Sequence, residues 1–331
     1  MEKYKIRYAT KEDIPAIKIF IDQNWKKNHI LVREDGFFEW QYTSNKLDYV
    51  LGTDENGAIQ GMLGFISYDD NDERDIATSM WKANPGTGFL GIKLLMFILE
   101  NEPHRTLFSP GINVKTSGGI YKRMNISMGK MNQWYRLRKL DSYSIAKVED
   151  TNIPNYDLKE NTNAVEYSTF NDLLNDFYFE KHVSKESVPY KSLTYIKHRY
   201  FEHPSYHYLV YGIKTDGIET DAVVIMRIQG CNGSKVLRFV DCIGNIESIG
   251  GMTKIIDEML AQFDAEYIDM YEKGVSAELL INAGWRRLDQ TSNIIPNYFS
   301  PFEQCNVDVN YCTTDENIVL FKGDGDQDRP N

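Results

Sequence analysis

Apolar and polar residues alternate along the 331-residue chain in a pattern that predicts strands and helices in turn. Residues 75–85 are mostly apolar and predict a buried strand, whereas residues 92–100 are apolar all round and predict a buried helix. Between them, GTGFLG at 86–91 holds too much glycine for either element. Further on, we expect a strand, a short helix and a final strand pair at 105–113, 116–125 and 126–140.

The two halves of the chain repeat this order of elements at an offset of about 158 residues. A strand–turn–helix start recurs with the same three residue types, as Tyr8, Thr10 and Asp13 and again as Tyr167, Thr169 and Asp172. Each half then continues to a hairpin, at 50–66 and 209–228, with a turn at Asn56-Gly57 or Asp216-Gly217. Chance agreement between short patterns is the alternative, because few residues are identical.

The repeat predicts two related domains joined by a polar connector. We expect the first domain at 1–146, the connector at 147–161 and the second domain at 162–331. A chain of this length can bury two cores, and 42% hydrophobic with 13% aromatic residues suits packed cores.

Charge and cysteine content narrow the class of partner. A net charge of -11 opposes general attraction to nucleic acid or to anionic membranes, so the expected partner is a small molecule. No apolar run reaches the roughly 20 residues of a membrane span, and the first residues lack the apolar segment of a signal peptide, which favours the cytoplasm. Four cysteines without a C-x-x-C pair predict reduced thiols, with neither a disulfide nor a metal site.

The glycine-rich join at 86–91 is the strongest chemical feature of the sequence. The first backbone N–H groups of a helix have no partner within the helix, and glycines let these groups converge on a ligand. Such a join suits a pyrophosphate. A tight turn that only allows close helix packing is the alternative for this stretch taken alone.

With the elements that follow it, the first half resembles the GNAT acyltransferase superfamily. WKANPGTGFLGIKLL at 81–95 is similar to the pyrophosphate loop of that family, and GGIYKRMNI at 118–126 is similar to its tyrosine helix. The usual Gln or Arg at the loop's start is replaced by Ala83 or Pro85, and Asn125-Ile126 replaces the usual Gly-Phe. The resemblance covers nearly the whole chain and implies an α/β (α+β) fold of two tandem GNAT-like domains, each a mixed, mostly antiparallel sheet flanked by helices.

The resemblance also implies acetyl-CoA, an acyl-CoA co-substrate, and a set of site residues. Tyr121 takes the general-acid position, and backbone N–H groups near 81–83 are expected to bind the oxyanion. The residues expected to bind the coenzyme are Trp81, Lys82, Ala83, Gly86, Thr87, Gly88, Phe89, Leu90, Gly91 and Asn113.

In the second half the same positions have lost these features. The glycines of 238–260 are not grouped, Glu247 stands where a polyanion would lie, and Leu280 occupies the place of Tyr121. We therefore expect the second domain to be catalytically silent and to help shape the acceptor pocket.

Candidates for the base and for acceptor binding are less specific. His29 has an ordinary pKa suited to proton transfer near neutrality, although a capping or surface histidine is the alternative. Trp25, Trp40 and Tyr42 could stack on a sugar ring or belong to the core. Asp241 and Asp326 are the remaining expected acceptor-binding residues. A cluster of three histidines, His198, His203 and His207, favours a structured loop over a metal site.

The tail DGDQDRPN at 324–331 leaves three interpretations open: a calcium loop without its closing Glu, a solvated tail, or a segment docked in a cleft. With its tandem domains and this tail, the chain resembles acetyltransferases of bacterial surface-polysaccharide synthesis. We expect an acetyltransferase that acts on an amino or hydroxyl group of a sugar or nucleotide-sugar. The alternatives are an aminoacyl-tRNA-dependent transferase of the peptidoglycan-crosslinking type and a non-catalytic ligand-binding protein.

Overall fold

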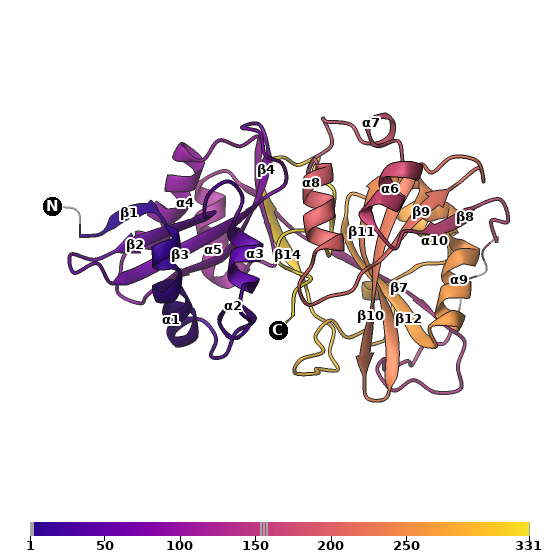
Figure 1. Cartoon of the computed structure of the whole chain (residues 1–331). Coiled ribbons are helices and arrows are strands. Elements are labelled where there is room, and N and C mark those ends of the chain that lie inside the picture. The colour runs from indigo at the N-terminus through magenta and orange to yellow at the C-terminus, as the bar shows by residue number, and fades with distance from the viewer. Residues whose placement is uncertain (1–2, 153, 155, 157, 331) are drawn as a thin grey trace. The chain divides into compact units, whose positions relative to one another are not determined.

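The computed structural model describes residues 3–152, 154, 156 and 158–330, which form two compact units (Figure 1). Unit 1 comprises residues 1–128, 311–316 and 329–331, and unit 2 comprises residues 129–310 and 317–328.

A seven-stranded mixed sheet forms the centre of unit 1, in the order β1-β2-β3-β4-β5-β14-β6. The β4–β5 pair is parallel, and β1–β2, β2–β3, β3–β4 and β5–β14 are antiparallel. The strands are β1 (Lys5–Tyr8), β2 (Tyr49–Thr53), β3 (Ile59–Ser67), β4 (Asp75–Ala83), β5 (Thr106–Pro110), β6 (Ser127–Lys130) and β14 (Asn310–Thr313).

Helices of unit 1 pack in two groups on two separate apolar clusters. One cluster joins α1 to α3 to the sheet, and the other joins α4 and α5 to it. Leu51 belongs to the first cluster and its neighbour Val50 to the second, so the clusters lie on opposite faces of β2. The helices are η1 (Lys11–Asp13), α1 (Ile14–Asn24), α2 (Ile30–Arg33), α3 (Phe37–Tyr42), α4 (Leu90–Asn101) and α5 (Val114–Arg123).

Two glycines of the sheet let α4 approach it closely. A Cβ on Gly52 would lie 2.6 Å from a methyl carbon of Leu90, and one on Gly61 would lie 3.0 Å from a methyl carbon of Leu94. Any larger residue at Gly52 would force the first turn of α4 outward. These glycines therefore fix the start of α4 next to the end of β4.

An eight-stranded sheet forms the centre of unit 2, in the order β13-β7-β12-β11-β10-β9-β8, with β15 paired to β12. Its strands are β7 (Asn132–Leu137), β8 (Asn163–Glu166), β9 (Leu209–Lys214), β10 (Ala222–Cys231), β11 (Ser234–Gly244), β12 (Ala265–Lys273), β13 (Arg286–Arg287) and β15 (Leu320–Phe321). Its helices are α6 (Phe170–Asp176), α7 (Phe179–His182), α8 (Leu193–Ile196), η2 (Lys197–Phe201), η3 (Ile246–Gly251), α9 (Thr253–Gln262), α10 (Ala277–Asn282) and η4 (Leu288–Gln290).

The expected fold class is confirmed, including two mixed sheets and both hairpin turns. Gly57 and Gly217 have positive φ angles of 82° and 76°, as the sequence pairs at these turns predict. All four cysteines are free. Within the described residues, no helix is long and apolar enough to cross a membrane, and no group of three or more His, Cys, Asp or Glu could hold a metal ion.

The final strand pair of the first half is divided between the two sheets, a feature that the sequence analysis did not anticipate. Strand β6 stays in the first sheet, whereas β7 lies between β12 and β13 in the second. The residues of β7 from Gln133 to Leu137 are all buried, which suits a central strand, while those of β6 alternate between half-buried and exposed, which suits an edge. In the first sheet, β14 from the C-terminal part of the chain fills the place between β5 and β6.

The compact units therefore differ in extent from the expected 1–146, 147–161 and 162–331. The described part of the connector packs as part of unit 2. Lys147 forms a β-bridge with Ile294, and Asp150 forms an ion pair with Arg286. The connector is anchored by these contacts.

Asp48 gives unit 1 a pH-dependent stability. Its carboxylate is buried and accepts hydrogen bonds from the Ser44 and Ser67 hydroxyls, yet burial raises its pKa from 3.8 to about 7. Folded protein therefore binds a proton that unfolded protein has lost, and stability falls as the pH rises from about 4 to about 7. We expect Asp48→Asn to increase the free energy of unfolding by about 1–3 kcal/mol at pH 8 and to have little effect below pH 4. Denaturant unfolding of both proteins across this range measures the difference, and a difference independent of pH would contradict the prediction.

Candidate functional site

Strands β4 and β5 diverge at their carboxyl ends and leave a fork in the first sheet. Their parallel pairing ends at Ala77 and Phe108, although β4 continues to Ala83. Just beyond this point β4 has a bulge against β3, because its register shifts between Gly64 and Met62. Met80 lies in the bulge with a positive φ of 53°. A bulge of this kind turns backbone groups out of the ladder, so the fork is where β4 can offer N–H groups to a ligand.

The glycine-rich loop leads from the end of β4 into α4. Gly86 and Gly88 have φ angles of 80° and 64°, and no atom lies within 4 Å of a Cβ placed on either. Thr87 closes the turn by donating from its hydroxyl to the Asn84 carbonyl at 2.6 Å, and Phe89 is 72% exposed. The loop therefore presents bare backbone to open space at the N-terminal end of α4.

Trp81 connects this loop to the tyrosine helix. Its indole Nε1 donates to the Gly91 carbonyl at 3.0 Å, and its ring lies 5.7 Å from the ring of Tyr121 between centroids. Asn113 caps α5, since its side chain accepts a hydrogen bond from the Lys115 N–H at 3.1 Å. Through Trp81, both α4 and α5 therefore contact β4.

Tyr121 is buried in the apolar cluster beneath α4 and α5. Burial raises its pKa well above the ordinary value, and the neighbouring thiol of Cys312 raises it further. Burial likewise raises the pKa of Cys312 to about 12. Both groups therefore hold their protons at neutral pH, and a protonated phenol can serve as a proton donor. Cys312 belongs to β14, so no pattern near Tyr121 in the sequence could have indicated it.

The comparisons with known proteins agree with this architecture. No family model matches the chain and no curated protein matches its sequence. A GCN5-related N-acetyltransferase from Anabaena variabilis ATCC 29413 superposes with a TM-score of 0.58 and 10% identity over 94% of this chain and 72% of its own. A candidate acetyltransferase from Pyrococcus horikoshii superposes with a TM-score of 0.50 and 12% identity over 96% of this chain and 92% of its own. A candidate N-acyltransferase from Enterococcus faecalis V583 superposes with a TM-score of 0.51 and 7% identity over 93% of this chain and 71% of its own.

The chain has a tandem GNAT fold. At such low identity the likeness concerns the fold, and the individual residues have to be judged from their own geometry.

In unit 2 of this tandem GNAT fold, other residues pack over Gly250 and Gly251, which lie where unit 1 has its glycine loop. A Cβ on Gly250 would lie 2.4 Å from a methyl carbon of Leu279, and one on Gly251 would lie 2.7 Å from the Thr162 hydroxyl. The start of α9 is also covered, because the Lys159 N–H donates to the Thr253 hydroxyl at 3.0 Å. The glycines here serve close packing within the protein.

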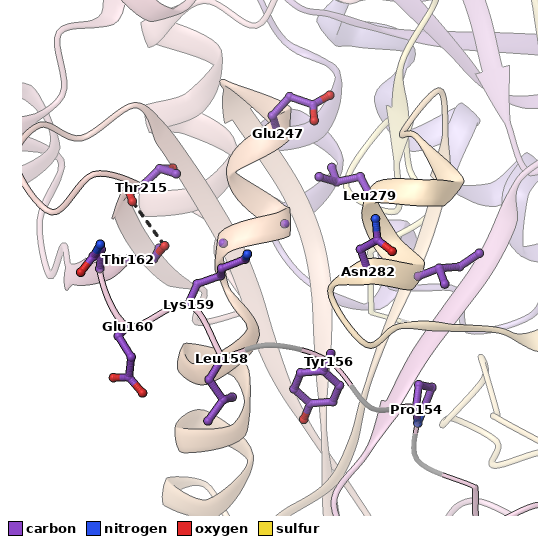
Figure 2. A pocket seen from close by; sticks show the side chains of 14 residues that line it. Pro154, Tyr156, Leu158, Lys159, Glu160, Thr162, Thr215, Glu247, Leu279 and Asn282 are labelled. Carbon is purple, nitrogen blue, oxygen red and sulfur yellow. Dashed lines mark hydrogen bonds between the residues drawn. The ribbon is translucent and has the colours of Figure 1, made fainter.

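A pocket of about 980 Å³ remains beside these covered glycines (Figure 2). Residues of the connector, with Lys159 and Glu160 labelled in the figure, and the adjoining Thr162 form one side of it, and Leu279 and Asn282 of α10 form another. The exposed Glu247 lies at its edge, which makes the pocket unfavourable for a polyanion.

The fork of unit 2 is filled by the chain's own C-terminal segment. Strand β15 pairs with β12, and the Gly323 N–H donates to the Val240 carbonyl at 2.7 Å, where β11 has its own bulge. Asp324 and Asp328 are fully buried there. In its described part the tail is therefore neither a solvated segment nor a calcium loop. In unit 2 it lies at the position that corresponds to the fork between β4 and β5 in unit 1.

Asp241 belongs to this buried network. Both of its carboxylate oxygens accept from the Lys191 ammonium, at 2.6 and 2.7 Å, and one also accepts from the Tyr200 hydroxyl at 2.5 Å. It is fully buried, so its surroundings correspond to structural ion pairing and not to the expected contact with an acceptor. Asp326 is half-buried and accepts from the Gln327 side chain at 3.3 Å.

His29 is buried at the start of α2, where its Nδ1 accepts the Leu31 N–H at 3.3 Å. Burial lowers its pKa to about 3, and the nearby cations Arg329, Lys26 and Arg33 lower it further. Since the Nδ1 lone pair is already used, the other nitrogen of the neutral ring carries the proton. This geometry favours the capping alternative over the expected general base.

The three aromatic residues expected at the acceptor site are placed differently from one another. Tyr42 is fully buried, its hydroxyl lies 2.8 Å from the Ser79 hydroxyl and its ring packs on Tyr49, so it is a core residue and cannot stack on a sugar. Trp40 is half-buried against Phe37, and Trp25 is 43% exposed. Only Trp25 offers a substantial ring surface among these three.

Proposed function

We propose that the protein is an acyl-CoA-dependent acyltransferase that moves an acetyl group from acetyl-CoA to an amino or hydroxyl group of a sugar or nucleotide-sugar. The observation that carries this proposal is the glycine loop at the start of α4, whose bare backbone faces open space beyond the end of the β4–β5 pairing, on the face of the sheet that holds Tyr121. The low-identity structural neighbours named for acetyltransferase activity support the reaction class.

The coenzyme would bind through backbone groups of unit 1. The backbone around Gly86 and Gly88 would hold the pyrophosphate, because their positive φ angles and the free space beside them allow close approach. The N–H groups of Thr87 and Leu90 already donate to the Asn84 and Thr87 carbonyls. The thioester would then lie in the fork between β4 and β5. Its carbonyl oxygen would be met by N–H groups at the bulge near Met80 and Trp81.

In the transfer step, the acceptor nitrogen or oxygen forms a bond to the thioester carbon and gives up a proton to solvent, and the carbon–sulfur bond breaks. The departing thiolate takes a proton, and we assign the supply of this proton to Tyr121. The phenol is protonated at neutral pH and so has a proton to give, but the burial that raises its pKa also opposes donation to a thiolate, which makes the Phe variant of Tyr121 the deciding test.

Gly88 provides the test of coenzyme binding. Asn and Asp have nearly the same size, and both tolerate a positive φ better than other side chains do, but only Asp adds a negative charge. We expect Gly88→Asn to weaken acetyl-CoA binding by less than tenfold and Gly88→Asp to weaken it by about 100-fold, since the carboxylate would face the pyrophosphate. Isothermal titration calorimetry measures both dissociation constants.

Wild-type protein is expected to bind one acetyl-CoA per chain, because only unit 1 keeps its glycines uncovered. Two sites per chain, or a Gly88→Asp variant that binds as tightly as Gly88→Asn, would show that the coenzyme does not use this loop.

A further inference from the structure

Arg329 reaches the β4 bulge of unit 1 from the opposite end of the sequence. Its Nη1 lies 3.5 Å from the Met80 sulfur, and its side chain is half-buried. Met80 is the bulge residue with positive φ, and its side chain belongs to the apolar cluster of α1 to α3. A guanidinium therefore contacts the side chain of the bulge residue near which the proposed thioester would be attacked.

The guanidinium lies on the face of the sheet opposite the tyrosine helix. Trp81 follows Met80 directly but belongs with Tyr121 to the cluster of α4 and α5. Consecutive residues of the bulge thus point to two faces. The proposed coenzyme and proton donor use the α4 face, which leaves the Arg329 side of the bulge for the second substrate.

Two more cations lie near the start of α2. Lys26 and Arg33 act electrostatically, together with Arg329, on the buried His29 ring. Both are exposed, and Arg33 donates to the Asn28 carbonyl at 3.2 Å and forms an ion pair with Glu34 at 3.6 Å. Arg329 and Lys26 therefore bring positive charge to this face of unit 1.

We infer that Arg329 binds an anionic group of the acceptor, with Lys26 adding positive charge nearby. This inference rests on the proposed function and specifies its substrate: a sugar that bears a carboxylate or a phosphate, such as a sugar acid or a nucleotide-sugar. A planar guanidinium suits both groups, because it can donate two parallel hydrogen bonds to either.

Binding of two anionic probes to CoA-saturated protein tests the inference. Saturation with CoA keeps the glycine loop occupied, so that UDP cannot bind there through its own pyrophosphate. UDP represents the phosphate source, D-glucuronate the carboxylate source, and methyl glucoside is the neutral control. We expect calorimetry to detect UDP or D-glucuronate, but not methyl glucoside, and the anion that binds identifies the source.

Substitution of Arg329 then assigns the site. We expect Arg329→Gln to weaken the binding of the anion by about 10- to 100-fold and Arg329→Lys to restore part of it, since Lys keeps the charge without the fork of donors. Arg123→Gln, in the exposed last turn of α5, is the matched control and should bind like wild type.

The CoA titration that precedes each experiment separates this inference from the proposed function. If CoA binds but the Arg329→Gln variant holds the anion as tightly as wild type, or if neither anion binds better than methyl glucoside, Arg329 has no such role. If CoA itself does not bind, the proposed function fails first.

Discussion

Replacement of Tyr121 by Phe is expected to lower kcat by about 10²- to 10⁴-fold, the usual contribution of general acid catalysis. The hydroxyl is the only group lost, and the ring that packs against Trp81 stays in place. Coenzyme binding uses the backbone of the glycine loop, so KM for acetyl-CoA should change little. Release of CoA from acetyl-CoA, measured with the best acceptor of a panel of amino- and hydroxy-sugars, gives both constants.

Tyr68→Phe is the matched control for this experiment. Tyr68 is equally buried in unit 1 and packs edge-on against Phe108, away from the glycine loop at the closed end of the β4–β5 pair. Loss of its hydroxyl should cost about 1 kcal/mol of stability or less and leave kcat near the wild-type value. If the two variants have the same kcat within threefold, Tyr121 is a structural residue and the thiolate takes its proton from water.

The Asp328→Asn variant is expected to lose about 3–5 kcal/mol of stability, because it leaves a buried guanidinium without its partner. Arg227 donates to both carboxylate oxygens of Asp328, at 2.7 and 3.1 Å, and the Tyr208 hydroxyl donates to one of them at 3.0 Å. These interactions lower the Asp328 pKa below its ordinary value of 3.8. The stabilisation is therefore present above about pH 4 and is lost as the pH falls further.

Denaturant unfolding at pH 7 and at successively lower pH measures this effect. Asp308→Asn, which removes a carboxylate from an exposed ion pair with Lys130, should change the free energy of unfolding by less than about 1 kcal/mol. A loss of similar size in the two variants would mean that the tail is not anchored through Asp328.

The sequence predicted those parts of the fold that short-range patterns determine. The turn glycines Gly57 and Gly217, the buried strand before the glycine loop and the apolar helix after it each follow from residues close together in the chain. The positions of β7 in the second sheet and of β14 in the first do not follow from nearby residues. They depend on which sheet can pair with both edges of each strand. Residues 133–137 are fully buried in the second sheet, but their sequence QWYRL includes Gln133 and Arg136 and so lacks the continuous apolar run of a central strand.

Prediction of the candidate site was limited for a similar reason. The glycine loop and Tyr121 lie within one continuous segment, so their proximity could be expected from the order of the elements. Cys312 and Arg329 come to unit 1 from the far end of the chain, and nothing in their local sequence indicates β4 or α5. Burial was also invisible in the sequence: Tyr42 and Asp241 have the chemistry of binding residues but are enclosed by the protein.

The place of β14 in the first sheet determines when that sheet can be completed during synthesis. The ribosome finishes β1 to β6 long before residues 310–313 emerge, so β5 and β6 must wait for the strand that lies between them. Until then each has an unpaired edge, which is a site for pairing with another chain. Unit 1, although it begins the sequence, therefore cannot close its sheet until nearly the whole chain has been made, and a ribosome paused in the second half of the message would hold an incomplete sheet exposed.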